Sequence, residues 1–146
     1  IVIIDLTFIA VSVFFAYLLR FNFSINDLVA NRADLGILLY VLLASLCIGI
    51  TGSYRGIIRY TGTQDGVRIF FMLLLNLLAV HAVNSIYYLQ YNHYLIPTSV
   101  IYISLLASFL LLFNYRLLVK YFFSFYKRSL LRNSNVLIYG AGQTGI

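Results

Sequence analysis

The sequence has 146 residues, of which 62% are hydrophobic and 10% are charged, and its formal net charge is +6 at pH 7. Soluble domains are roughly 45–50% apolar and about 25% charged, and disordered chains are poor in aromatic residues, which make 17% of this sequence. The composition therefore excludes an ordinary soluble domain and a disordered chain, and it indicates an integral membrane protein. The basic residues border apolar stretches instead of gathering on a solvated domain, so we expect no nucleic-acid partner.

Four segments are long and apolar enough to be membrane-spanning helices, since about 20 helical residues cross a hydrocarbon layer roughly 30 Å thick. They cover residues 1–19, 35–54, 69–89 and 98–115. The first contains one charged residue, Asp5, and the other three contain none. The connecting segments are short, which makes neighbouring helices antiparallel. The sequence thus predicts an all-α membrane domain, a bundle of four transmembrane helices over residues 1–115, in contact with the lipid bilayer.

The basic residues indicate how this bundle is oriented. Eight of them lie between the second and third spans or after the fourth: Arg55, Arg59, Arg68, Arg116, Lys120, Lys127, Arg128 and Arg132. Only Arg20 and Arg32 lie on the other side. Because cytoplasmic flanks accumulate Lys and Arg, we expect a multi-pass protein of the bacterial inner membrane with both ends of the chain in the cytoplasm. Tyr87, Tyr88, Tyr91 and Tyr94 then cluster at the outer interface.

Three polar residues within the spans are candidates for a function. Asp5 is the one acid inside a span, and an intramembrane carboxylate is a functional candidate by default. It lies near the cytoplasmic end of its helix, so the favoured reading is a structural ion pair with Arg55, Arg59 or Arg116. His81 and Asn84 are three residues apart and share one helix face. Without an acid at their depth, interhelical hydrogen bonds are favoured over a proton relay.

Arg55 and Arg59 are candidates for binding an anionic head group or a phosphate. They lie four residues apart in the loop between the second and third spans, and such a pair could clamp a phosphate if the loop is helical. The alternative is that they serve only topology, because Arg and Tyr at the inner interface are what orientation and anchoring require.

The sequence after the fourth span differs from the apolar spans. Residues 116–132 form a basic, aromatic connector that we expect to lie at the inner membrane surface as a helix. Residues 136–139 then predict a short buried strand, followed by a G-x-G-x-x-G motif with Gly140, Gly142 and Gly145. In dinucleotide-binding folds these glycines allow a tight turn and the approach of the backbone to a pyrophosphate. We therefore expect residues 133–146 to begin a Rossmann-like α/β domain that the chain does not complete.

These features together resemble the CapD-like polysaccharide biosynthesis proteins, which are membrane-bound nucleotide-sugar dehydratases and epimerases. The resemblance rests on Asp5, the segment Leu18-Leu19-Arg20-Phe21, the loop with Tyr54-Arg55-Gly56 and Arg59-Tyr60, and the glycine turn. It implies that the chain is the membrane region of a larger enzyme, which holds NAD or NADP and acts on a UDP-activated amino sugar. The cofactor and the catalytic residues would lie mainly in a later domain of the same chain.

Two alternatives stay open. A polyprenyl-phosphate sugar-phosphate transferase would have a similar membrane region followed by a Rossmann-like region. A transporter or channel subunit is disfavoured, because the spans lack broken helices and paired intramembrane charges. A single cysteine, Cys47, with no other Cys or His nearby predicts neither a disulfide nor a metal site. The sequence leaves homo-oligomerisation, the sugar substrate and its stereochemistry open.

Overall fold

The computed structural model describes residues 2–52 and 63–130, and all regular structure in this part of the chain is helical. The helices are α1 (Val2–Arg20), α2 (Ile25–Ala30), α3 (Ala33–Thr51), α4 (Thr63–Tyr91) and α5 (Thr98–Leu130). Four of them are long and apolar enough to cross a membrane, which confirms the predicted all-α membrane bundle. The predicted strand at 136–139 and the glycine turn lie outside the described residues.

Local backbone signals end or begin several of these helices. The N–H group of Gly52 donates to the Ile48 carbonyl, and its left-handed φ of 59° ends α3. A glycine suits that position because it has no Cβ to clash. Pro97 directly precedes α5, and its carbonyl accepts from the N–H group of Val100 at 2.9 Å. Proline has no N–H group to donate to a preceding turn, so it suits a position where a helix begins.

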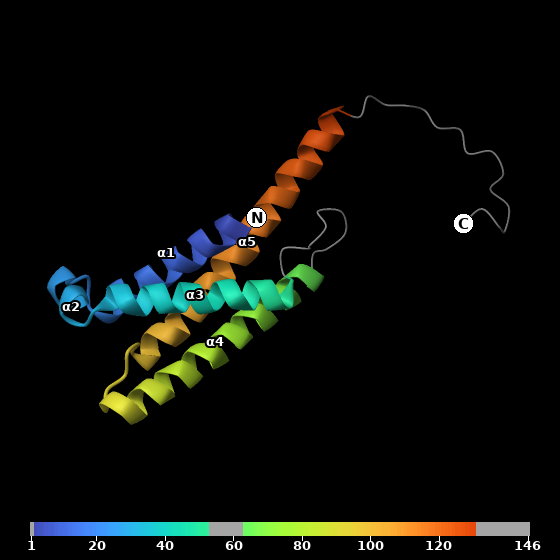
Figure 1. Ribbon diagram of the computed structural model, residues 1–146. Coiled ribbons are helices and arrows are strands. Elements are labelled where there is room, and N and C mark those ends of the chain that lie inside the picture. The colour runs from blue at the N-terminus through green and yellow to red at the C-terminus, as the bar shows by residue number, and fades with distance from the viewer. Residues whose placement is uncertain (1, 53–62, 131–146) are drawn as a thin grey trace, which may run out of the picture.

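The long helices form a bundle in which each one packs against two others. Helix α1 packs on α3 and α5, and α4 packs on the same two helices from the other side (Figure 1). The core between them is apolar and includes Ile9, Val13, Ile48, Met72, Leu73, Ile101 and Leu112, each at most 1% exposed. The outer faces are apolar too, with large exposed side chains such as Phe14, Leu42, Leu78 and Leu106. Helices that are apolar all round suit a lipid environment.

The structure differs from the expected elements in two places. The first connecting segment contains the short helix α2 instead of being a loop throughout. The fourth span (98–115) and the helical connector (116–132) were predicted as successive segments, and the structure joins most of them in one unbroken helix, α5, which continues to Leu130. Figure 1 shows these last turns projecting past the N-terminal end of α1 instead of folding back along it.

The two ends of the bundle differ in their polar residues. The charged end is defined by Asp5, Asp65, Arg116 and Lys120, which belong to α1, α4 and α5. The turn end lies opposite, where α4 connects to α5, and is defined by Tyr17, Gly36, Asn84 and Ile96.

Candidate functional site at the charged end

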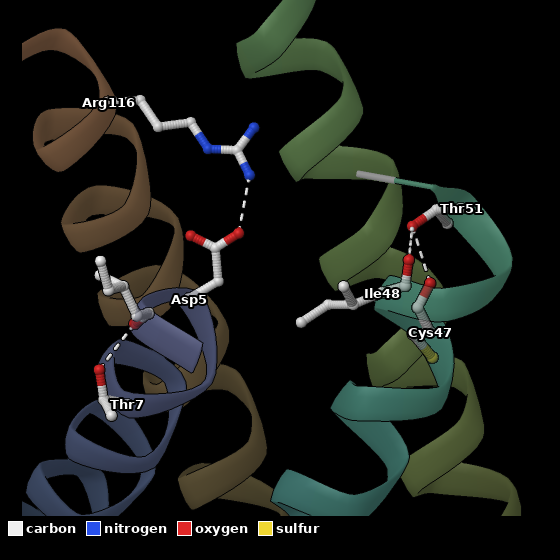
Figure 2. Close-up of polar contacts among 7 residues, drawn as sticks. Asp5, Thr7, Cys47, Ile48, Thr51 and Arg116 are labelled. Atoms are coloured by element: carbon white, nitrogen blue, oxygen red, sulfur yellow. Dashed lines mark hydrogen bonds and ion pairs between the residues drawn. The ribbon is translucent and has the colours of Figure 1, made fainter. Parts of the chain in front are cut away.

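The predicted pairing of Asp5 with an arginine is present, and its partner is Arg116. The guanidinium Nη2 of Arg116 donates to Asp5 Oδ2 at 2.9 Å, across 111 positions of the chain (Figure 2). The Asp5 side chain is fully buried, and that of Arg116 is 13% exposed. A buried carboxylate is tolerated only when it is paired, because desolvation strongly disfavours an isolated charge. This ion pair therefore ties α1 to α5 at a depth where neither charge would be stable alone.

A second ion pair lies beside the first and was not predicted. Lys120 Nζ lies 3.3 Å from Asp65 Oδ2, and the two side chains are 26% and 11% exposed. Asp65 belongs to the first turn of α4, where a negative charge also interacts favourably with the helix dipole. Arg116 and Lys120 are four residues apart, so one face of α5 binds α1 through Arg116 and α4 through Lys120.

The chemistry that this arrangement supports is structural. Each of the two pairs joins one acid to one base, so each pair is neutral as a unit. No group of three or more His, Cys, Asp or Glu residues that could hold a metal occurs within residues 2–52 and 63–130. The two pairs connect α5 to α1 and to α4 where α5 leaves the bundle.

Asn84 lies in the bundle interior, as the sequence predicted, but its hydrogen bonds go to the turn before α5 and not to another helix. Its Oδ1 accepts from the N–H groups of Leu95 and Ile96 at 3.0 and 3.1 Å, and its Nδ2 donates to the Ile96 carbonyl at 2.8 Å. One amide side chain therefore satisfies three main-chain groups that would otherwise be buried without partners.

His81 is half-buried one turn before Asn84. Its ring lies against that of Tyr102 on α5, with 5.6 Å between the ring centroids. Its Nε2 makes no hydrogen bond within the part of the chain that the structure describes. The geometry brings His81 and Asn84 to neighbouring places on α4, but it does not join them in one hydrogen-bonded site.

The remaining predicted site residues lie outside the described residues. These are Arg55 and Arg59, proposed for head-group or phosphate contacts, and Gly140, Gly142 and Gly145, proposed for a nucleotide. The site residues that the sequence analysis missed are Asp65 and Lys120. A signal for them existed, because Lys120 follows Arg116 by one helical turn and Asp65 lies just before the third span, at the same membrane depth.

Comparisons with known proteins do not assign the chain to a group. No protein family, no curated protein and no solved structure matches it. The structure itself shows a bundle with four helices able to cross a membrane, tied at one end by two ion pairs.

Proposed function

We propose that this bundle is the membrane anchor of a nucleotide-sugar dehydratase or epimerase in bacterial surface glycan biosynthesis. The observation that carries the proposal is the course of α5, which leaves the bundle as an unbroken helix and runs to Leu130. The glycine motif at Gly140, Gly142 and Gly145 begins ten positions after Leu130 in the sequence. A helix that continues past the bundle suits an anchor that presents a soluble domain.

The length of α5 supports this reading. Its 33 residues span about 50 Å at about 1.5 Å per residue, whereas the hydrocarbon layer is about 30 Å thick. The distance from Thr98 to Arg116 along the helix is about 27 Å. With Thr98 at one edge of the hydrocarbon layer, the charged end lies near the other edge, and the turns of α5 after Lys120 lie beyond that edge.

The two ion pairs support the proposal as well, because they fix the place where α5 leaves the bundle. Arg116 binds α1 and Lys120 binds α4 within one helical turn. In the proposed enzyme this exit faces the cytoplasm. NAD or NADP and the UDP-activated amino sugar bind to the part that follows, near the lipid-linked steps that consume the product.

The enzymatic part of the proposal is tested with the full-length product of the gene in membrane vesicles. With UDP-N-acetylglucosamine we expect conversion to a 4-keto-6-deoxy sugar nucleotide or to an epimer, detected by NMR, without an added lipid acceptor. Transfer of a sugar phosphate to added polyprenyl phosphate would instead favour the transferase alternative. Absence of all these reactions, with a range of UDP-sugars, would contradict the enzymatic proposal.

The anchoring part is tested separately by fusing residues 1–130 to a soluble fluorescent protein. We expect the fusion to stay in the membrane pellet after alkaline extraction. Release of the fusion into the supernatant would contradict the anchoring role whatever the outcome of the enzyme assay.

The orientation is tested by cysteine labelling in a Cys47→Ser background. Single cysteines at Asn26 and Asn92 should react with an impermeant thiol reagent added outside, and a cysteine at Thr63 should react only after the membrane is opened. Labelling at Thr63 in intact cells would reverse the proposed orientation.

A further inference from the structure

The outward face of α4 is apolar along most of the helix and has one charged residue near its start. Exposed apolar side chains recur there every three or four positions, which is the spacing of a single helix face. We call these residues the outer stripe: Phe71, Leu75, Leu78, Ala82, Ile86 and Leu89. Arg68 lies three positions before Phe71 and therefore continues the same face. It is the only charged residue of α4 after Asp65.

Arg68 differs from the two basic residues that define the charged end. Arg116 and Lys120 are held by carboxylates of α1 and α4. Arg68 follows Asp65 by about one turn, so it lies near the same end, but its side chain is exposed. It makes no hydrogen bond or ion pair with any residue that the structure describes. Its positive charge is therefore not neutralised within this part of the chain.

The length of the outer stripe places Arg68 at the edge of the hydrocarbon layer. From Arg68 to Leu89 the helix rises about 32 Å, at about 1.5 Å per residue, and the hydrocarbon layer is about 30 Å thick. When the outer stripe lies in the hydrocarbon, Arg68 is level with the head groups. A charged side chain facing lipid is costly within the hydrocarbon, whereas a long one at its edge can extend to the head groups.

We propose that Arg68 and the start of the outer stripe bind an anionic phospholipid, with the phosphate on the Arg68 guanidinium and an acyl chain along Phe71 and Leu75. The planar guanidinium donates two parallel hydrogen bonds to phosphate oxygens, and the negative charge of the lipid neutralises it. An anionic head group fits better than a zwitterionic one, because it contains no cation that competes for the phosphate.

A second copy of this chain fits Arg68 less well than a lipid does. The chain has four acids. Asp5 and Asp65 are already paired at the charged end, and Asp27 and Asp34 lie at the opposite end, near the starts of α2 and α3. A parallel copy therefore offers Arg68 no free carboxylate at its own depth. The lipid site goes beyond the proposed anchoring function, because it requires nothing that follows residue 130.

The test is a lipid titration of the full-length protein in detergent, followed by native mass spectrometry. Two lipids with the same acyl chains are compared, dioleoylphosphatidylglycerol and dioleoylglycerol, which lacks the phosphate. In Arg68→Gln we expect the affinity for phosphatidylglycerol to fall about threefold, as for an exposed ion pair, and the affinity for dioleoylglycerol to stay unchanged. Unchanged affinity for phosphatidylglycerol would overturn the proposal. An equal loss for both lipids would also overturn it, because Arg68 would then act on the packing of the bundle and not on the phosphate.

Arg32→Gln is the matched control, because Arg32 is exposed and lies just before α3, at the opposite end of the bundle. The substitution removes the same charge, and the affinity for phosphatidylglycerol should not change. An equal loss in Arg32→Gln and Arg68→Gln would indicate general attraction between a basic protein and an anionic lipid, and would overturn a site at Arg68. Excess inorganic phosphate should leave the phospholipid bound. Its displacement would show that Arg68 binds free phosphate and would overturn the lipid as the occupant.

Discussion

The two ends of the bundle are held together by different kinds of interaction. At the charged end, α5 meets α1 and α4 through Asp5–Arg116 and Asp65–Lys120. At the turn end, α4 and α5 are joined by a short connection whose main chain is bound by the neutral amide of Asn84.

The difference follows from chain connectivity. Asn84 and Ile96 are 12 residues apart, so the chain itself keeps them close and the side chain only has to satisfy the turn. Asp5 and Arg116 are 111 residues apart, and the register of α1 against α5 depends on side-chain contacts. A charged pair is more selective than apolar packing for this purpose, because a wrong register leaves a buried charge unpaired. Four substitutions test this comparison, and their effects are measured as changes in the free energy of unfolding of the purified protein in detergent.

The largest effect is expected from Asp5→Asn. The substitution removes the charge that neutralises Arg116, and breaking a buried ion pair from one side costs about 3 kcal/mol. Asp34→Asn is the control, because Asp34 is an exposed acid in the first turn of α3 and should change stability by less than about 0.5 kcal/mol. Equal effects of the two substitutions would show that the Asp5–Arg116 pair does not stabilise the bundle.

A somewhat smaller effect is expected from Asn84→Ala at the turn end. The N–H groups of Leu95 and Ile96 lose their acceptor, and buried groups left without partners cost about 2 kcal/mol. Asn114→Ala is the matched control, since it removes one local hydrogen bond on an exposed face. If Asn84→Ala and Asn114→Ala lower the free energy of unfolding equally, the Asn84 amide does not stabilise the turn.

Gly36→Ala tests the packing of α1 on α3 at the turn end. A Cβ at Gly36 would overlap the hydroxyl group of Tyr17, which is buried, and also meet Ile96. Such overpacking costs about 1.5 kcal/mol. Gly49→Ala is the control, because no atom lies within 4 Å of a Cβ built there. Adding Tyr17→Phe to Gly36→Ala removes the overlapping oxygen and should restore most of the lost stability, and failure to do so would contradict this explanation.

The smallest effect is expected from Asp65→Asn. Lys120 is partly exposed and can turn toward water when its partner is neutral, so the loss should be about 0.5 kcal/mol. The difference between the stability losses of Asp65→Asn and Asp5→Asn is what the experiment measures, because the Asp65–Lys120 pair is both longer and more exposed than the Asp5–Arg116 pair. A loss as large as that of Asp5→Asn would mean that Asp65 has a larger structural role than its pair with Lys120 accounts for.

The sequence by itself determined the membrane class, the approximate spans and the need of Asp5 for a basic partner. These properties are local or compositional: apolar runs of about 20 residues and an acid within an apolar segment. Three possible partners for Asp5 were indicated, Arg55, Arg59 and Arg116, and no local property distinguishes between them.

Only the tertiary structure decided which residues meet. The rotation of α5 brings Arg116 to Asp5 and Lys120 to Asp65, and the close approach of α1 to α3 places Tyr17 on Gly36. The turn before α5, and not a neighbouring helix, supplies the partners of Asn84. Hydropathy could not predict these contacts, because each depends on the order and rotation of helices that are apolar on every side, so that no polar face indicates which way a helix points.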